Sequence, residues 1–325
     1  MKKLTLVFAF MLAVAGAAAQ SMYVHKTDGN VYEFKVSDVD SINFAASTTD
    51  DYLYTVTYMP NGTVGDMIID TVRYGRNYTF REQLYVKEWN TRADGSGAGF
   101  TPKETIPLTR NLILYAILPD GYGVENGYYY VDLGLPSGLK WATCNVGATA
   151  AGRAGNYYAW GETEPKTTYS WATYKWCNGS SSTFTKYNTK SSYGTVDNKT
   201  VLDLADDAAR ANWGGQWRMP TDAEWTELRE NCEWTWTSNY NGTGVAGRIV
   251  TSNINGNSIF LPAAGCRDDD GLNSAGYYGN YWSSSLYAGN PLSAWIVYFY
   301  SDNVSRSNYY GRYYGQSVRP VLFGE

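Results

Sequence analysis

Histidine is almost absent from this chain of 325 residues, in which His25 is the only one. Nucleophilic catalysis by a Ser–His or Cys–His pair requires an imidazole within hydrogen-bonding distance of the nucleophile. His25 lies in a short N-terminal segment, far along the sequence from the largest predicted domain. We therefore expect no such pair in that domain, and we predict that the protein is not an enzyme.

Charged residues are also scarce. They make up 18% of the chain, and 31 acidic against 26 basic residues leave a formal net charge of −5. Proteins that bind nucleic acid through its phosphates present a basic surface. The acidic balance therefore argues against nucleic acid as a partner.

No apolar run in the sequence is long enough to span a bilayer. Residues 1–19 instead have the pattern of a secretory signal peptide, with Lys2 and Lys3, an apolar stretch from Leu4 to Ala15 and small residues before a cleavage site. No cysteine stands at the new N-terminus, so a lipid anchor is not expected. The sequence predicts an exported protein without a transmembrane segment, located in the periplasm, on the cell surface or in the medium.

The chain has only four cysteines and no Cys-x-x-Cys pair, which disfavours a zinc ribbon. An oxidising compartment permits two disulfides, in any of three pairings. Free cysteines are equally among the residue types most often buried. Both states, two disulfides or buried free thiols, remain open for Cys144, Cys177, Cys232 and Cys266.

Tyrosine, tryptophan and glycine are abundant, at 30, 12 and 33 residues, which favours short strands and turns over a helical bundle. Residues 20–48 are predicted to form an N-terminal β-hairpin segment and the start of a linker. Asp28-Gly29-Asn30 is a turn signal between two alternating runs. The stretch from Ala45 to Asp51 is small and polar, as linkers are.

Residues 50–118 form a second predicted unit. Tyr54 to Tyr58 alternates as a strand does, Asn61-Gly62 predicts a turn, and Leu112 to Leu118 predicts a further strand. With Trp89-Asn-Thr91 and Asp94-Gly-Ser-Gly97, these segments resemble the Listeria–Bacteroides repeat family. The chain departs from that family after Asn61-Gly62, where Thr63 replaces a glycine. The resemblance implies a small β-grasp-like module of a bacterial surface protein, with a spacer or adhesion role.

Two helices are predicted within residues 126–323, the largest unit. The first covers Thr200 to Asn212, where apolar residues recur at helical spacing and two glycines follow. The second begins with a capping box formed by Thr221 and Glu224. One face of this second helix is expected to lie in the core and carries Trp225, Leu228 and Cys232.

Short strands are predicted elsewhere in this unit, at Tyr128 to Leu133, Leu139 to Cys144, Val245 to Thr251, Ser258 to Leu261 and Ala294 to Tyr300. Asn255-Gly256 joins two of these strands into a hairpin. The stretch from Gly161 to Lys199 is polar and is predicted to be a long loop. Loops of this length within a domain are often functional.

Several motifs occur in order along this unit: Gly134-Leu-Pro-Ser-Gly-Leu-Lys-Trp141, Ala159-Trp-Gly-Glu162, Gly214-Gly-Gln-Trp-Arg-Met-Pro-Thr221, Phe260-Leu-Pro-Ala-Ala-Gly265, Tyr281-Trp-Ser-Ser-Ser285 and Ser317-Val-Arg-Pro320. Together they resemble the Fibrobacter major paralogous domain family, and Trp217 to Trp225 is similar to a segment of the sulfatase-modifying, formylglycine-generating proteins. The resemblance implies an α+β, C-type-lectin-like fold with two helices and short antiparallel strands. It implies no activity, because the formylglycine-generating proteins use a late cysteine pair and no cysteine follows Cys266.

Tyrosine, asparagine and serine make up about half of residues 273–317. The same residue types dominate antibody binding loops, since tyrosine offers rigid contact area and the small polar residues adapt their hydrogen bonds. We predict that this stretch binds a glycan or a protein ligand. The predicted ligand-binding residues are Tyr277, Tyr278, Asn280, Tyr287, Asn303, Arg306, Asn308, Tyr309, Tyr310, Arg312, Tyr313 and Tyr314.

The composition of this stretch is also compatible with a target of a diversity-generating retroelement. Some lectin-like proteins of this general type vary at adenine-rich codons, such as those for asparagine, in the terminal part of the domain. A reverse transcriptase gene nearby would be the signature of such a system. The oligomeric state of the protein stays open.

Two other functions remain open. Glu162 and Glu164 are candidate carboxylates for an enzyme that acts on glycans or envelope polymers, a reaction that needs two carboxyl groups roughly 5–10 Å apart. Alternatively, the chain is a structural adhesion or spacer protein without a discrete site. We expect no cofactor, although Asp268, Asp269 and Asp270 offer oxygen ligands for Ca²⁺ without the spacing of an EF-hand.

Overall fold

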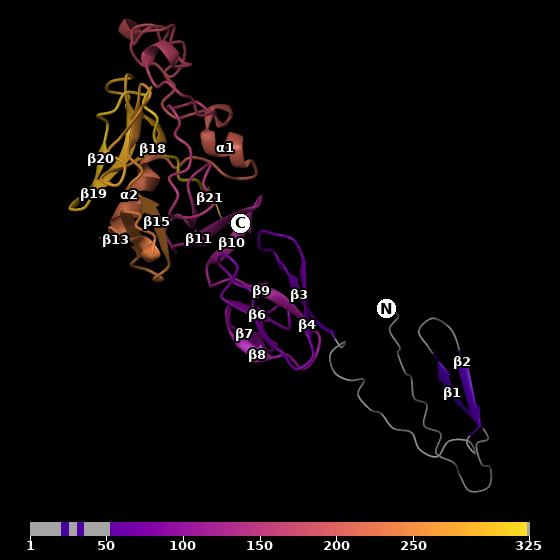
Figure 1. The fold of residues 1–325 in the computed structure, drawn as a ribbon. Coiled ribbons are helices and arrows are strands. Elements are labelled where there is room, and N and C mark those ends of the chain that lie inside the picture. The colour runs from indigo at the N-terminus through magenta and orange to yellow at the C-terminus, as the bar shows by residue number, and fades with distance from the viewer. Residues whose placement is uncertain (1–20, 26–30, 36–52, 324–325) are drawn as a thin grey trace.

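The computed structural model describes residues 21–25, 31–35 and 53–323, and Figure 1 shows their arrangement. The described chain is a mixed α+β protein with two α-helices and many antiparallel strands. The predicted signal peptide at 1–19, the turn at 28–30 and the linker at 45–51 lie outside the described residues. None of the described helices combines the length and apolar character that a bilayer span requires.

The N-terminal segment is a β-hairpin, as predicted. Strand β1 (Ser21–His25) pairs antiparallel with β2 (Val31–Lys35). Tyr23 lies opposite Glu33, and its hydroxyl donates a hydrogen bond of 2.9 Å to the Glu33 carboxylate.

The next unit, which we call the β module (53–118), is built on a five-stranded mixed sheet of order β4-β3-β9-β6-β7. Its strands are β3 (Leu53–Met59), β4 (Ile68–Arg73), β6 (Glu88–Asn90), β7 (Gly99–Phe100) and β9 (Leu112–Ile117). Strands β3 and β9 run parallel at its centre, and the other pairs are antiparallel. A second, two-stranded sheet joins β5 (Asn77–Thr79) to β8 (Thr105–Pro107).

Alternation of apolar side chains produces the core of the β module. In β9, Leu112, Leu114 and Ala116 are buried while the residues between them are not, as the pleat of a strand requires. The predicted turn at Asn61-Gly62 is present, with both residues at positive φ (50° and 83°), the conformation that asparagine and glycine tolerate best. The predicted strands of this segment are therefore confirmed.

The C-terminal domain (122–323) contains four further sheets. In the first, β10 (Tyr122–Glu125), β11 (Tyr128–Asp132), β12 (Leu139–Ala142) and β21 (Val321–Phe323) pair antiparallel, so the last strand closes onto the first segments of the domain. The second joins β13 (Cys232–Thr237), β14 (Gly247–Ser252) and β15 (Ser258–Pro262). The others are β16 (Cys266–Asp268) with β17 (Gly271–Asn273), and β18 (Gly279–Leu286), β19 (Ala294–Tyr300) and β20 (Asn303–Ser307).

The first α-helix is shorter than predicted. Helix α1 covers Ala208–Trp213, and a 3₁₀ turn at Leu204–Asp206 precedes it. Asp207 is the N-cap, because its carboxylate accepts hydrogen bonds from two backbone N–H groups of the first turn. Residues 200–202 are not helical, since their backbone bonds instead to Ser284 and Leu286 at 3.0 and 2.8 Å. The prediction that a helix begins at Thr200 is therefore wrong.

The second α-helix, α2 (Asp222–Asn231), is confirmed with its capping box. The Thr221 hydroxyl accepts a hydrogen bond from the Glu224 N–H, and the Glu224 carboxylate accepts one from the Thr221 N–H. Trp225 and Leu228 are buried on its core face, and Cys232 is buried where β13 begins.

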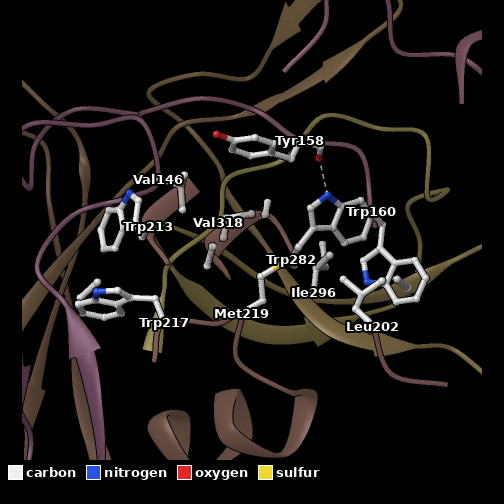
Figure 2. Packing of buried hydrophobic residues seen from close by; sticks show 14 of the residues in the cluster. Val146, Tyr158, Trp160, Leu202, Trp213, Trp217, Met219, Trp282, Ile296 and Val318 are labelled. Carbon is white, nitrogen blue, oxygen red and sulfur yellow. Dashed lines mark hydrogen bonds between the residues drawn. The ribbon is translucent and has the colours of Figure 1, made fainter. Parts of the chain in front are cut away.

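The core of the C-terminal domain is rich in tryptophan, and Figure 2 shows one part of it. Trp282 lies at the centre, and its indole N–H donates to the carbonyl of Tyr158 at 2.8 Å. The indole of Trp160 likewise donates to the carbonyl of Ser283 at 2.8 Å. Each ring therefore buries its apolar body and also satisfies its one polar atom.

The segment 161–199 has no strand among its residues, as predicted for a loop, but it is packed against the domain. Its only regular elements are 3₁₀ turns at Trp171–Thr173 and Ser191–Tyr193. A separate cluster of buried side chains fixes it in place, comprising Tyr157, Ala159, Tyr169, Tyr174, Cys177, Phe184 and Ala264.

All four cysteines are free thiols in the structure. Cys177, Cys232 and Cys266 are buried, and Cys144 is partly buried. Burial raises the pKa of both Cys232 and Cys266 to about 11, which makes them poor nucleophiles. Of the two states left open by the sequence, the structure shows the free thiols.

Candidate functional site

Eight tyrosines within residues 277–314 form what we call the tyrosine surface: Tyr277, Tyr278, Tyr298, Tyr300, Tyr309, Tyr310, Tyr313 and Tyr314. Six of them belong to the predicted ligand-binding residues. Tyr298 and Tyr300 were predicted only as strand residues, because alternation in β19 does not reveal which face is covered.

One group of rings lies over the β18–β19 hairpin. The centroids of Tyr278 and Tyr298 are 5.4 Å apart in a stacked arrangement. Tyr300 contacts both, at 5.7 Å from Tyr278 and 5.8 Å from Tyr298. These three rings support one another, which limits the rotamers that each can adopt.

A second group lies in the segment after β20. The rings of Tyr309, Tyr310 and Tyr314 follow one another at centroid distances of 5.6 and 5.2 Å. Tyr313 lies 4.5 Å from Tyr314 and 4.8 Å from Trp171 of the long loop. The long loop therefore supports one end of this group.

The two groups adjoin at Tyr310. Burial raises the pKa of Tyr310 to about 12, and the neighbouring Cys266 and Tyr298 add to the shift. Burial likewise raises the pKa of Tyr298 to about 12, with a further contribution from Tyr278. The inner hydroxyls thus stay neutral at physiological pH and act as hydrogen-bond donors and acceptors.

Two rings at the rim of the tyrosine surface are far more exposed than those beneath them. Tyr309 is 83% exposed and Tyr277 is 73% exposed, the highest values for large apolar or aromatic side chains in the described residues. Exposed aromatic rings on a packed base are typical of recognition surfaces.

A groove of about 610 Å³ lies on another part of the same domain. A β-bulge between Trp282 and Leu286 in β18 creates one wall, because it interrupts the pairing with β19. The hydroxyl of Ser285 in this bulge accepts a hydrogen bond of 3.1 Å from the Asp222 N–H at the start of α2. We call this feature the tryptophan groove, and its lining includes Thr200, Thr221, Asp222, Ser285, Tyr287 and Trp295.

A charged pair stands beside the aromatic wall of the tryptophan groove. Arg306 Nε lies 2.7 Å from Asp222 Oδ1, and the Arg306 guanidinium carbon lies 3.4 Å from the ring centroid of Trp295. Tyr287 meets Trp295 edge-on, with centroids 4.9 Å apart. Burial raises the pKa of Asp222 above its ordinary value, although Arg306 opposes this shift.

The structure separates the predicted binding residues into several places. Tyr287 lines the tryptophan groove, and Arg306 lies at its border through its contacts with Asp222 and Trp295. Asn303 is exposed where β20 begins, and Asn308 is partly buried after it ends.

Two of the predicted binding residues are buried in the interior, contrary to the expectation that they are accessible. Arg312 is fully buried, with its guanidinium carbon 4.0 Å from the centroid of the Phe184 ring and a hydrogen bond of 2.8 Å to the Tyr187 carbonyl. Asn280 is fully buried in β18. Composition placed them in the site, whereas tertiary packing assigns them to the core.

Only one of the two candidate carboxylates is engaged in internal contacts. Glu162 is buried and accepts hydrogen bonds from the Lys166 ammonium at 2.9 Å and from the Lys175 N–H at 2.8 Å. Glu164 is exposed.

The three candidate calcium ligands lie on the β16–β17 turn. Asp269 adopts a positive φ of 48°, and its backbone pairs with Tyr169. Asp268, one of these three residues, contacts the tyrosine surface through Tyr314. Burial raises the pKa of Tyr314, and its hydrogen bonds with Tyr313 and Asp268 raise that pKa further. Within residues 21–25, 31–35 and 53–323, no three His, Cys, Asp or Glu side chains are grouped so as to hold a metal ion.

The sequence signalled neither Asp222 nor Trp295 as a site residue. Asp222 was expected only as the first residue of a helix, and Trp295 only as a strand residue. Their proximity to Arg306 depends on the packing of α2 against β19 and β20.

Comparisons of the chain with protein families, with characterised proteins and with solved structures find no match.

Proposed function

We propose that this chain is an exported binding protein whose C-terminal domain binds a glycan or protein ligand through the tyrosine surface, without catalysing a reaction. The observation that carries the proposal is the exposure of Tyr309, whose ring packs against Tyr310 in a group of mutually packed tyrosines, together with the exposure of Tyr277, which precedes the packed Tyr278 in the sequence. Such rings lose little conformational entropy on binding, because their neighbours already restrict them.

The proposal includes the architecture of the chain. Two helices, short antiparallel strands and the pairing of β21 with β12 support a C-type-lectin-like C-terminal domain related to the Fibrobacter major paralogous domain family. The central parallel pair β3–β9 in a mixed sheet supports a β-grasp-like module that serves as a spacer or in adhesion. We further propose that the exposed positions around Tyr309 are candidates for retroelement diversification, which a reverse transcriptase gene beside this one would support.

The alternative functions have less support from the geometry. An enzyme using Glu162 would need to release that carboxylate from Lys166. A spacer without a discrete site would present a uniformly polar surface over 273–317, whereas exposed aromatic rings occur there. We therefore favour ligand binding.

The proposal is tested by screening the mature protein against glycan arrays and surface-protein libraries, then measuring affinity for each ligand found. Replacing both Tyr309 and Tyr277 with alanine is expected to weaken binding by roughly tenfold or more, because exposed aromatic anchors dominate such interfaces. Tyr74→Ala, which removes an exposed ring from the β module, is the matched control. Unchanged affinity in the double variant would place the binding site elsewhere.

A further inference from the structure

The tryptophan groove is independent of the tyrosine surface. Side chains alternate between the two faces of a strand, so Trp295 and Tyr298 in β19 point to opposite sides. Arg306 lies directly opposite Val297 in the β19–β20 pairing and shares the face of Trp295. A ligand in the groove and a ligand on the tyrosine surface would therefore occupy different faces of this sheet.

The groove combines an aromatic wall with a fixed hydrogen-bonding pair. Tyr287 and the part of Trp295 that Arg306 does not cover provide apolar area, and Asp222 in the lining, together with Arg306 at its border, provides an acceptor and a donor next to each other. Both members of the pair are held in place, Arg306 by stacking on Trp295 and Asp222 by its position in the first turn of α2. Such preorganisation lowers the cost of binding.

The charge of the groove favours a neutral ligand. Asp222 and Arg306 neutralise each other at 2.7 Å, so neither a cation nor an anion gains a free countercharge there. The remaining polar groups of the lining include the side-chain hydroxyls of Thr200, Thr221 and Ser285. Those of Thr221 and Ser285 already accept backbone N–H groups of α2, which leaves their hydrogens to donate to a ligand.

We propose that the tryptophan groove binds a neutral pyranose unit of a glycan. Arg306 covers one face of Trp295, so the apolar C–H face of the sugar lies against Tyr287 and the part of Trp295 that lines the groove, and two adjacent sugar hydroxyls hydrogen-bond to Asp222 and, at the border of the groove, to Arg306. A pyranose matches this lining because it presents an apolar face and a polar rim on one rigid ring. The volume of about 610 Å³ lies in the ordinary range of small-ligand sites and leaves room for more than one sugar unit.

The test uses the mature full-length protein and four neutral trisaccharides: maltotriose, cellotriose, mannotriose and triacetylchitotriose. Isothermal titration calorimetry measures affinity, and saturation-transfer NMR identifies the sugar protons that contact the protein. We expect at least one trisaccharide to bind saturably, with the strongest transfer to ring C–H protons of a single unit. Asp222→Asn and Tyr287→Ala should each weaken this binding roughly tenfold or more, since they remove a charged acceptor and an aromatic wall.

Further variants separate this proposal from misfolding and from the tyrosine surface. Arg306→Lys keeps the charge but loses the planar stack on Trp295, so it should also weaken binding while the near-ultraviolet circular dichroism stays native. Tyr74→Ala, which removes an exposed ring from the β module, should leave affinity unchanged. The proposal is overturned if no neutral trisaccharide binds at millimolar concentration, or if binding survives Asp222→Asn and Tyr287→Ala. Binding lost only in Tyr309→Ala also overturns it, and would assign the sugar to the tyrosine surface instead.

Discussion

One arginine of the β module and one of the C-terminal domain, Arg81 and Arg319, are held in different ways. In the β module, Arg81 is about half exposed and forms a bidentate ion pair with Asp70, at 2.6 and 2.7 Å. In the C-terminal domain, Arg319 is fully buried and has no carboxylate partner among the described residues. It donates instead to the carbonyls of Ala142 and Phe260 and to the Asn145 side chain, at 3.0, 2.8 and 2.9 Å.

The difference follows from how each region satisfies its backbone. The sheet of the β module pairs its own N–H and C=O groups, and the buried side chains that donate to other carbonyls of the module, such as Trp89 and Asn90, are neutral. In the C-terminal domain, buried carbonyls at the end of β12 (Ala142) and in the edge strand β15 (Phe260) receive a side-chain donor from outside their own sheets. A guanidinium has five N–H donors and stays charged when buried, which suits it to join such strands.

The largest effect is expected from Arg319→Leu. This change leaves three buried acceptors unpaired and should destabilise the C-terminal domain by about 3–5 kcal/mol. Guanidinium-induced unfolding followed by tryptophan fluorescence measures it, since every tryptophan except Trp89 lies in that domain. Arg81→Leu in the β module should cost about 1 kcal/mol or less, because its ion pair is solvent-screened. Equal costs for the two variants would contradict the proposed difference between the regions.

A smaller effect is expected from Asp207→Ala. The Asp207 carboxylate caps α1 and also accepts the Met219 N–H at 2.8 Å, so its removal leaves buried donors without partners. We expect a loss of about 2–3 kcal/mol, measured as a lowered midpoint of thermal unfolding. Asp66→Ala, at an exposed position in the β module, is the matched control and should change the midpoint little. If both changes prove neutral, α1 does not depend on this cap.

The smallest effect is the pH dependence contributed by Asp70. The Arg81 hydrogen bonds hold the pKa of Asp70 below its usual value of 3.8. The stabilisation is therefore fully present above pH 3.8 and is lost as the pH falls through the lower folded-state pKa. Asp70→Asn should speed hydrogen exchange in peptides covering residues 68–81 at neutral pH, because it lowers the free energy of local opening by about 1 kcal/mol or less. In strong acid the variant should exchange as the original protein does. A variant effect that persists in strong acid would show that Asp70 acts through packing rather than charge.

Local signals in the sequence predicted several elements well. The capping box at Thr221 marks the start of α2, and the prediction for β19, Ala294 to Tyr300, coincides with the observed strand. Each of these depends on neighbours within a few residues. The start of α1 was mispredicted because Thr200 to Leu202 bonds to β18, more than eighty residues further along the chain.

The candidate site was only partly predictable. Composition directed attention to residues 273–317, and Tyr277 and Tyr309 are indeed exposed there. Composition did not distinguish these from Arg312 and Asn280, which lie in the core. Whether a side chain binds an external ligand depends on the side of the sheet that the rest of the chain covers.

The sequence by itself determined the α+β character, the hairpin at the N-terminus, the strands of the β module and the helix that begins after Thr221, because these follow from alternation, turn residues and capping within short stretches. Only the tertiary structure decided that the cysteines stay apart as free thiols and that the tyrosines form one connected surface. It also brought Asp222, Trp295 and Arg306 together. These three residues come from α2, β19 and β20, so their contact is set by the packing of the whole domain.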